Sequence, residues 1–343
     1  MITGKYQFFY DQMPEDAMRS FYLDALSAAQ ARQSSFITSG AIMRCKEMTV
    51  PNGILYMYGD HPELFDLNIG LNSVQFQPNG RIRVGLFYRE SSEVPAQREL
   101  KLCQAVERVL KTCFPDGWQH LSPLKREKLL FNYIADHVSY DHEACKQVKR
   151  DQKWATQNSD AWSAYGALVK GKAVCQGIAC AFKLLCDQVD IPSLVVIGTI
   201  AANQERHAWN IVRIDGQFYH VDCTWMLRTS INQQIPFARY QYFNVPDQMM
   251  IKNRAMEMRY LPECRSLRHN PFYIRGLCAG ETEDAVTKLR AQIAKGEKRI
   301  AVLCVGITPS QSEAEDIMQR AVRGTGKQLR WYVNGHFLGG YLT

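Results

Sequence analysis

Three residues in the middle of the chain have the types and spacing of a nucleophilic site. Cys175 stands in the stretch GKAVCQG, His207 follows 32 residues later, and Asp222 lies 15 residues beyond it. A thiolate attacks amide and ester carbonyls, a histidine transfers the proton, and a carboxylate orients the imidazole. The order of nucleophile, base and orienter therefore predicts a Cys-His-Asp site for acyl transfer.

The position of Cys175 favours the thiolate form. The residues from 174 to 188 have helical spacing, so Cys175 falls at a helix N-terminus. There, free backbone N–H groups and the positive end of the helix dipole stabilise an anion. The same N–H groups can hold the oxyanion of an attacked carbonyl. We expect Gly171 and Gly177 to leave room for a substrate backbone beside the thiol.

The base and its orienter fall on two strands that the sequence predicts to be a hairpin. The segments RHAWNIVRI and QFYHVDCTW are joined by Asp-Gly, a preferred two-residue turn. This turn pairs residue 214 with residue 217, which makes His207 and Asp222 diagonal neighbours on one face. A slip of one residue in the register would place them on opposite faces and remove the site.

The remaining pattern is that of a mixed α+β chain. Apolar spacing and turn residues predict helices over 14–31, 95–113 and 123–138, a buried strand over 193–200, and a hairpin around 78–80. Near the C-terminus they predict a short strand near Phe272, helices over 283–295 and 309–322, a strand over 299–306, and a hairpin around 334–335.

These elements suggest four successive parts of the chain. We expect an N-terminal α+β lead-in over residues 1–120 and a catalytic core over 121–250. A polar stretch over 251–270 is the candidate linker, and residues 271–343 are expected to form a small α/β domain.

Composition excludes several other classes of protein. The chain has 343 residues, 46% of them hydrophobic and 22% charged, enough to build a core without disulfides or structural metal. The eleven cysteines contain no Cys-x-x-Cys pair, so we expect free thiols, no metal site and no cofactor. The net charge of +7 is scattered, which disfavours nucleic-acid binding.

The sequence also bears on location. No signal peptide and no apolar run of membrane-spanning length is present, so we expect a cytoplasmic protein that does not enter the membrane. Export by a route that needs no signal peptide is left open, as is the oligomeric state.

Several stretches resemble a known family. VCQGIACAFKLLCDQVDIP is similar to the nucleophile block of the transglutaminase-like superfamily, and RHAWNIVRIDGQFYHVDCTW resembles its histidine and aspartate blocks. AYGALVKGKAVCQG and YFNVPDQMM also fit, and HPELFDL and IADHVSYD are similar to bacterial members with an extra N-terminal domain. The resemblance is strong over 121–250 and moderate before it, and it does not extend clearly to 271–343.

The resemblance implies a papain-like α+β core, in which the cysteine helix packs on an antiparallel sheet. It implies Cys175 as nucleophile, His207 as general base and then acid, and Asp222 as orienter. The family often has an upstream aromatic side chain that assists the oxyanion hole. The candidates for that role are Tyr140, which we favour, Trp162 and Tyr165.

Three neighbours of the motif are candidates for the substrate pocket. Trp209 and Trp225 follow the histidine and aspartate motifs and are expected to wall the site. Gln176 stands beside the nucleophile, and its role is open.

The triad leaves the reaction undecided. If water hydrolyses the thioester, the enzyme is a peptidase or amidase with protein or peptide substrates, which is the interpretation we favour. An amine resolving it would make a transglutaminase, and attack on glutamine side chains with water would make a deamidase. The choice depends on how dry the pocket is and on amine access. A protein that keeps the fold as a non-catalytic binding scaffold is a further alternative, and thiol reactivity of Cys175 distinguishes it. No calcium-loop motif is present.

Overall fold

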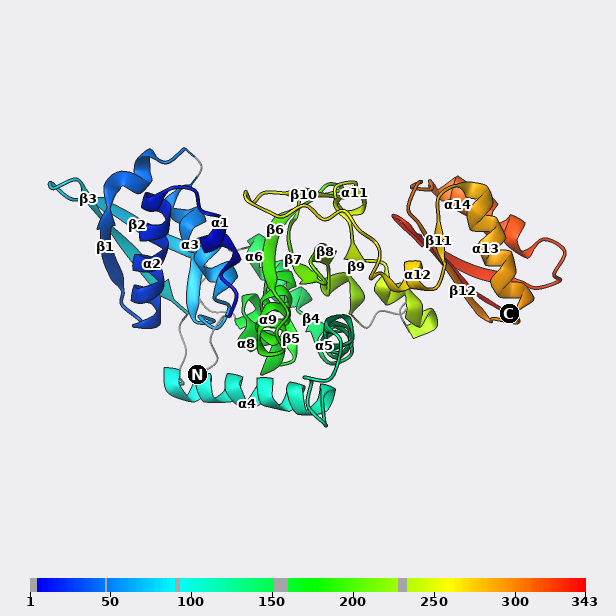
Figure 1. Cartoon of the computed structure of the whole chain (residues 1–343), viewed down its shortest axis with the longest axis horizontal. Coiled ribbons are helices and arrows are strands. Elements are labelled where there is room, and N and C mark those ends of the chain that lie inside the picture. The colour runs from blue at the N-terminus through cyan, green and yellow to red at the C-terminus, as the bar shows by residue number, and fades with distance from the viewer. Residues whose placement is uncertain (1–4, 47, 90–92, 151–159, 228–232) are drawn as a thin grey trace.

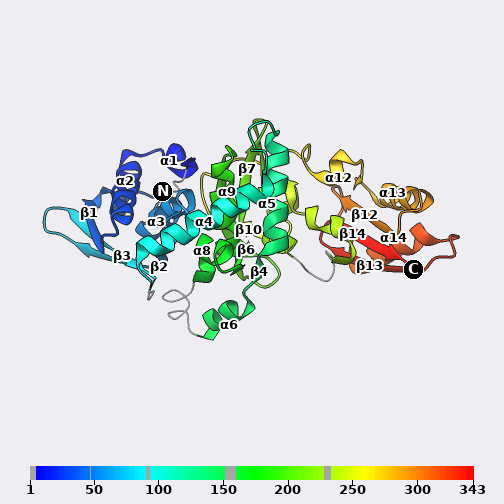
Figure 2. The same cartoon turned by 90° about the horizontal axis from the view of Figure 1, so that it is seen from below.

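The computed structural model describes residues 5–46, 48–89, 93–150, 160–227 and 233–343. The elements at the two chain ends lie on opposite sides of a central sheet (Figures 1 and 2). Helix α4 (Pro95–Cys113) runs alongside the N-terminal region and the central region that holds this sheet. The structure confirms a mixed α+β protein with antiparallel sheets. In the described part of the chain, no helix combines the length and apolarity needed to cross a membrane.

The N-terminal region packs helices on a three-stranded sheet. It contains α1 (Phe8–Gln12), α2 (Asp16–Gln30), β1 (Ser35–Ser39), α3 (Val50–Asp60), β2 (Leu67–Phe76) and β3 (Arg81–Tyr88), with strand order β1-β3-β2. The expected helix over 14–31 is α2, and the hairpin expected around 78–80 joins β2 to β3.

The central region carries the predicted site elements. Helix α5 (Pro123–His137) begins at Ser122, whose side chain accepts a hydrogen bond from the backbone N–H of Lys125. After it come β4 (Ser139–Tyr140), α6 (His142–Arg150), α8 (Ala164–Leu168), β5 (Lys172–Ala173) and α9 (Cys175–Gln188). The sheet that follows has the order β10-β6-β7-β8-β9, and every neighbouring pair is antiparallel.

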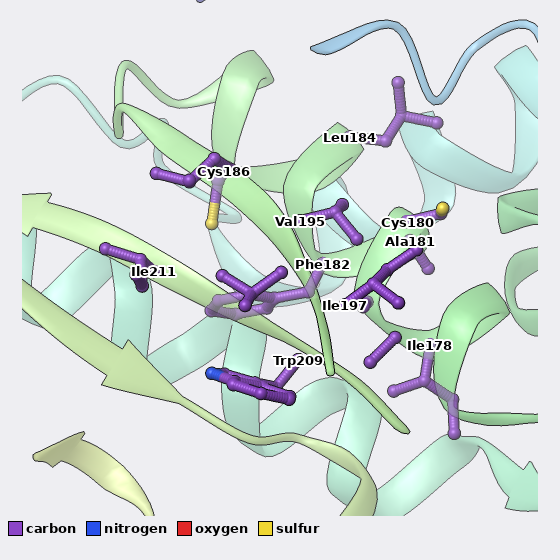
Figure 3. Packing of buried hydrophobic residues seen from close by; sticks show 14 of the residues in the cluster. Ile178, Cys180, Ala181, Phe182, Leu184, Cys186, Val195, Ile197, Trp209 and Ile211 are labelled. Carbon is purple, nitrogen blue, oxygen red and sulfur yellow. The ribbon is translucent and has the colours of Figure 1, made fainter. Parts of the chain in front are cut away.

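Helix α9 packs against strands β6 (Ser193–Ile200) and β7 (Arg206–Ile214). Ile178 and Phe182 of the helix and Ile211 of β7 are fully buried in this layer (Figure 3). Burial of each such side chain contributes about 1.5–3 kcal/mol relative to exposure. This packing fixes the position of the helix N-terminus relative to the strands.

Three further strands complete the central sheet, and a short helix lies between the last two along the chain. In chain order these elements are β8 (Gln217–Val221), β9 (Phe243–Val245), the helix α11 (Asp247–Met250) and β10 (Arg254–Met256). Residues 254–256, expected within a linker, instead pair with β6 as an edge strand. The polar composition concealed this strand, because only three residues pair and the edge strand needs no continuous apolar run.

The C-terminal region is a four-stranded sheet with two helices. It contains β11 (Cys278–Ala279), α13 (Thr282–Ala294), β12 (Arg299–Cys304), α14 (Gln311–Val322), β13 (Leu329–Asn334) and β14 (Phe337–Leu342), in the order β11-β12-β14-β13. The expected strand near Phe272 is wrong, because residues 271–274 form helix α12 (Pro271–Ile274). Asn270 caps this helix through the N–H of Phe272 at 2.8 Å, and Pro271 occupies its first position.

Candidate active site

The thiol of Cys175 lies at the first position of α9, with Val174 as the N-cap residue. The backbone N–H of Val174 donates to the carbonyl oxygen of Ala161 at 3.0 Å and anchors the lead-in. Ile178 then donates to Val174 at 3.0 Å, which is the first bond of the helical ladder. The N–H groups of residues 175–177 precede it and therefore have no acceptor within the helix. The partly buried Cys175 thus lies beside groups that stabilise an anion.

His207 and Asp222 meet as the predicted register requires. Ile214 pairs with Gln217 across the turn, so the predicted register of β7 and β8 is confirmed. His207 Nε2 lies 2.7 Å from Asp222 Oδ2. His207 is 4% exposed and Asp222 is fully buried. The pair is therefore shielded from water, which strengthens its electrostatic interaction.

The imidazole of His207 is held in its charged form. Burial lowers its pKa, but the charge and hydrogen bond of Asp222, followed by the interaction with Cys175, outweigh this effect and raise the pKa to about 9. Because Nε2 faces Asp222, Nδ1 is the ring nitrogen left for the thiol. The arrangement can therefore hold a thiolate beside an imidazolium.

Asp222 accepts hydrogen bonds from four donors. Its Oδ1 accepts from the backbone N–H groups of Thr224 at 3.0 Å and Trp225 at 3.3 Å. Its Oδ2 is shared by His207 and the Nη2 of Arg254, each at 2.7 Å. Burial raises the pKa of this carboxyl group, yet His207 and Arg254 together lower it to about 2. The carboxylate is therefore ionised and fixed in orientation.

Arg254 is the residue that the sequence reasoning missed. It lies on β10 opposite Ile200 and is 3% exposed. Its neighbours in the sequence, KNRAMEM, show no pattern that marks a buried arginine. Its contact with Asp222 joins chain positions 32 residues apart through a short edge strand, so local periodicity holds no signal for it.

The three aromatic candidates for the oxyanion hole differ in their surroundings. The hydroxyl of Tyr140 lies 3.4 Å from the Sγ of Cys145, and its pKa is raised by burial and then by the charge of Cys175. Tyr140 therefore lies within electrostatic range of the nucleophile. Tyr165 is buried, stacked on Phe65 at 5.2 Å, and packs in the core.

The candidates beside the nucleophile are tied to the backbone. The Nε2 of Gln176 donates to the carbonyl oxygen of Trp162 at 3.3 Å. The main-chain carbonyl of Trp162 thus helps to hold the side chain of Gln176 in place. Gly177 does not provide space for a substrate, contrary to expectation, because a Cβ there would lie 2.3 Å from the carbonyl oxygen of Ala161. Its small size permits close packing of α9 on the 160–163 segment. Gly171 has a φ of 67°, which a turn requires.

The two tryptophans have different positions. Trp225 is 38% exposed, and its ring meets that of His207 edge-on at 6.5 Å, as a pocket wall would. Trp209 is 1% exposed and does not face an open pocket, contrary to expectation. Its ring stacks on His207 at 5.8 Å, and its Nε1 donates to the Nδ1 of His220 at 3.0 Å. Trp209 therefore supports the base from within the core.

A separate group of possible metal ligands lies behind Trp209. Ligand atoms of His220, Asp247 and Cys264 lie within 4.8 Å of one another. The Nδ1 of His220 accepts from Trp209, so its proton resides on Nε2, which faces Asp247 Oδ1 at 2.7 Å. Both ring nitrogens are thereby engaged in hydrogen bonds, and metal-bound histidines usually donate from the second nitrogen rather than accept there. The donor set therefore fits a hydrogen-bonded support for Trp209 better than a metal centre.

All eleven cysteines lie in the described part of the chain, and each has a free thiol. Burial raises the pKa of several of them, including Cys180 to about 12 on the same helix as Cys175. Such thiols stay protonated at neutral pH and are poor nucleophiles. The partly exposed Cys175 differs from them in its contact with His207.

Comparison with known proteins links the region to one superfamily. The family model of the transglutaminase-like superfamily core matches residues 117–223, which include Cys175, His207 and Asp222. Mouse (Mus musculus) kyphoscoliosis peptidase is 26% identical over 114 residues, which cover 30% of this chain and 16% of that protein.

Two solved structures are also similar over part of their length. One is described as a TGase, with a TM-score of 0.33 and 17% identity, over 45% of this chain and 43% of that chain. The other is described as a candidate cysteine protease from Cytophaga hutchinsonii, with a TM-score of 0.25 and 15% identity, over 46% and 62% of the two chains.

Proposed function

We propose that this chain, which carries a domain of the transglutaminase-like superfamily, is a cysteine-dependent enzyme that hydrolyses amide bonds in proteins or peptides. The observation that carries the proposal is the buried contact between His207 Nε2 and Asp222 Oδ2 at 2.7 Å, which leaves Nδ1 for Cys175. We assign Cys175 as nucleophile, His207 as base and acid, and Asp222 as orienter. A papain-like arrangement of α9 on the β6–β7 layer accords with these roles.

The first half of the reaction forms a thioester. The thiolate of Cys175 bonds to the carbonyl carbon, and the carbonyl oxygen takes up the negative charge. The N–H groups at the start of α9 hold this oxyanion. We assign Tyr140 an assisting role, because the charge of Cys175 is among the causes that raise its pKa. When the oxyanion collapses, the C–N bond breaks and the leaving amine takes the proton of the His207 imidazolium.

The second half releases the acid. His207, now neutral, takes a proton from water, and the resulting hydroxide bonds to the thioester carbon. The C–S bond breaks, the carboxylic acid leaves, and the thiolate–imidazolium pair is restored. Trp225 is 38% exposed and Cys175 is partly exposed, so water has access to the thioester. The similarity to a protein named a peptidase supports hydrolysis over amine transfer.

The test is a peptide library incubated with the wild type and with Cys175→Ala, with and without an added primary amine. Cys103→Ala is the matched control, because Cys103 is a partly exposed thiol on α4, remote in sequence from the site. We expect cleavage products from the wild type and the control and none from Cys175→Ala. Amine incorporation would identify a transglutaminase instead, and ammonia release without cleavage a deamidase. Equal products from Cys175→Ala and the wild type would refute the assigned nucleophile.

A further inference from the structure

We propose that Arg254 is a positioning residue of the active site, which keeps Asp222 ionised and aimed at His207, and that the C-terminal β13–β14 hairpin braces this arginine. The proposal rests on the proposed acyl-transfer function. It gives the C-terminal region a part in the chemistry, although the active-site residues all lie in the central region.

The contact between Arg254 and Asp222 is buried on both sides. The Nη2 of Arg254 lies 2.7 Å from Asp222 Oδ2, and the two side chains are 2% and 0% exposed. An isolated carboxylate in such a place would become protonated or would require a partner. A protonated Asp222 could no longer stabilise the imidazolium of His207. Arg254 supplies a charge that persists at every pH of interest.

The other groups that face Asp222 do not replace this charge. His207 of β7 loses its positive charge during each turnover, when it protonates the leaving amine. His220 of β8 has its pKa lowered by burial and stays neutral. Cys223 has its pKa raised by burial and stays a thiol. Arg254 is therefore the cation that keeps the carboxylate charged while His207 is neutral.

Arg254 is itself held in a polar and aromatic setting. Its Nη1 donates to Asn253 Oδ1 at 2.7 Å, and the Nδ2 of Asn253 donates to the hydroxyl of Tyr242 at 2.8 Å. The guanidinium carbon lies 4.3 Å from the centre of the Tyr242 ring and 5.5 Å from that of Trp225. Aromatic faces at these distances attract a guanidinium group. The fork of Arg254 is thus fixed before any substrate binds.

The C-terminal hairpin reaches this support. The turn between β13 and β14 contains Gly335, with a φ of 56°, and a Cβ there would lie 3.4 Å from the Tyr242 hydroxyl and 3.7 Å from Asn253 Nδ2. A second contact joins the regions, because Lys252 donates to the Oγ1 of Thr308 at 2.8 Å. The hairpin therefore lies against the two side chains that hold Arg254.

The first test removes the arginine. Arg254→Met, Arg254→Lys and the control Arg265→Met, which loses an exposed arginine, are compared in the full chain. The readouts are the rate of Cys175 alkylation by iodoacetamide as a function of pH and the titration of His207 by NMR. Without its cationic partner Asp222 protonates more readily. The acid limb of the profile, where the rate of Cys175 alkylation falls as the pH is lowered, should therefore move up by about one pH unit or more in Arg254→Met. Arg254→Lys should restore part of the shift.

The outcomes separate this proposal from the proposed function. If wild-type Cys175 reacts no faster than an ordinary thiol, the proposed function fails. If the wild type reacts fast and folded Arg254→Met keeps the same acid limb, the role of Arg254 alone is refuted. Should Arg254→Met fail to fold, Asn253→Ala weakens the same support, and an unchanged acid limb in that variant would count against the proposal.

The second test concerns the hairpin. Gly335→Leu introduces a side chain against Tyr242, while Gly326→Leu carries a similar backbone strain at a φ of 69° with nothing within 4 Å. We expect Gly335→Leu to move the acid limb of Cys175 alkylation upward and Gly326→Leu to leave it in place. Equal profiles for the two folded variants would overturn the bracing role.

Discussion

Replacement of Asp222 by asparagine tests the electrostatic core of the site. The two carboxylate oxygens accept from donors on both sides, the backbone N–H groups of Thr224 and Trp225 on one and His207 and Arg254 on the other. An asparagine amide has one oxygen and one NH₂ group. Either orientation therefore places an N–H group against donors, and it also removes the charge.

The expected loss of Cys175 reactivity follows from the pKa of His207. Asp222 is the main reason that the pKa of His207 rises from 6.5 to about 9 despite burial. This difference corresponds to about 3 kcal/mol, or about two orders of magnitude in the population of the thiolate–imidazolium pair. An unassisted thiol with a pKa of about 8.5 is mostly protonated near pH 6, so we expect Asp222→Asn to slow alkylation of Cys175 about 100-fold near that pH. We also expect a loss of about 3–5 kcal/mol in the free energy of unfolding, because the Arg254 charge is left unpaired.

The assay is iodoacetamide alkylation followed by peptide mapping, with urea unfolding alongside. Asp215→Asn is the matched control, because Asp215 lies in the turn of the same hairpin at a φ of 48° and asparagine is also favoured there. A folded Asp222→Asn variant whose Cys175 reacts within about twofold of the wild type would refute the reasoning.

Three smaller predictions follow. Gly177→Ala places a Cβ 2.3 Å from the Ala161 carbonyl and should cost about 1–3 kcal/mol in urea unfolding, whereas Gly280→Ala, with nothing within 4 Å, should not. Trp225→Ala should raise KM, because the exposed ring walls the pocket, and a lowered kcat with an unchanged KM would contradict that role. The raised pKa of His207 stabilises the fold fully below about pH 6.5, and this stabilisation should vanish as the pH rises through about 9. Calorimetry of His207→Ala against the wild type measures it, and a constant difference would contradict it.

The sequence was sufficient where local rules decide the structure. The Asp-Gly turn fixed the register of β7 and β8, and the register placed His207 and Asp222 on one face. The start of α9 at Cys175 followed from the change of apolar spacing after the Gly-Lys-Ala-Val lead-in. The catalytic roles and the domain boundaries remain predictions.

Other features depend on contacts that no local pattern encodes. The sequence predicts Trp209 as a pocket wall because its neighbours in the sequence are site residues. In the structure its ring is buried, and its indole N–H donates a hydrogen bond to His220. Arg254 reaches the site because it lies on an edge strand of which only three residues pair with β6. Residues 271–274 form a helix rather than the expected strand, although Asn270 followed by proline is a recognisable helix start.

The proposed function depends on a reactive pair formed by Cys175 and His207. The most direct test is the alkylation rate of Cys175 by iodoacetamide from about pH 5 to about pH 9, in the wild type and in His207→Ala. We expect fast, selective modification of Cys175 well below the free-thiol pKa of about 8.5, and we expect His207→Ala to lose it. Modification of Cys175 at the rate of the other cysteines, or at an equal rate in both proteins, would contradict it.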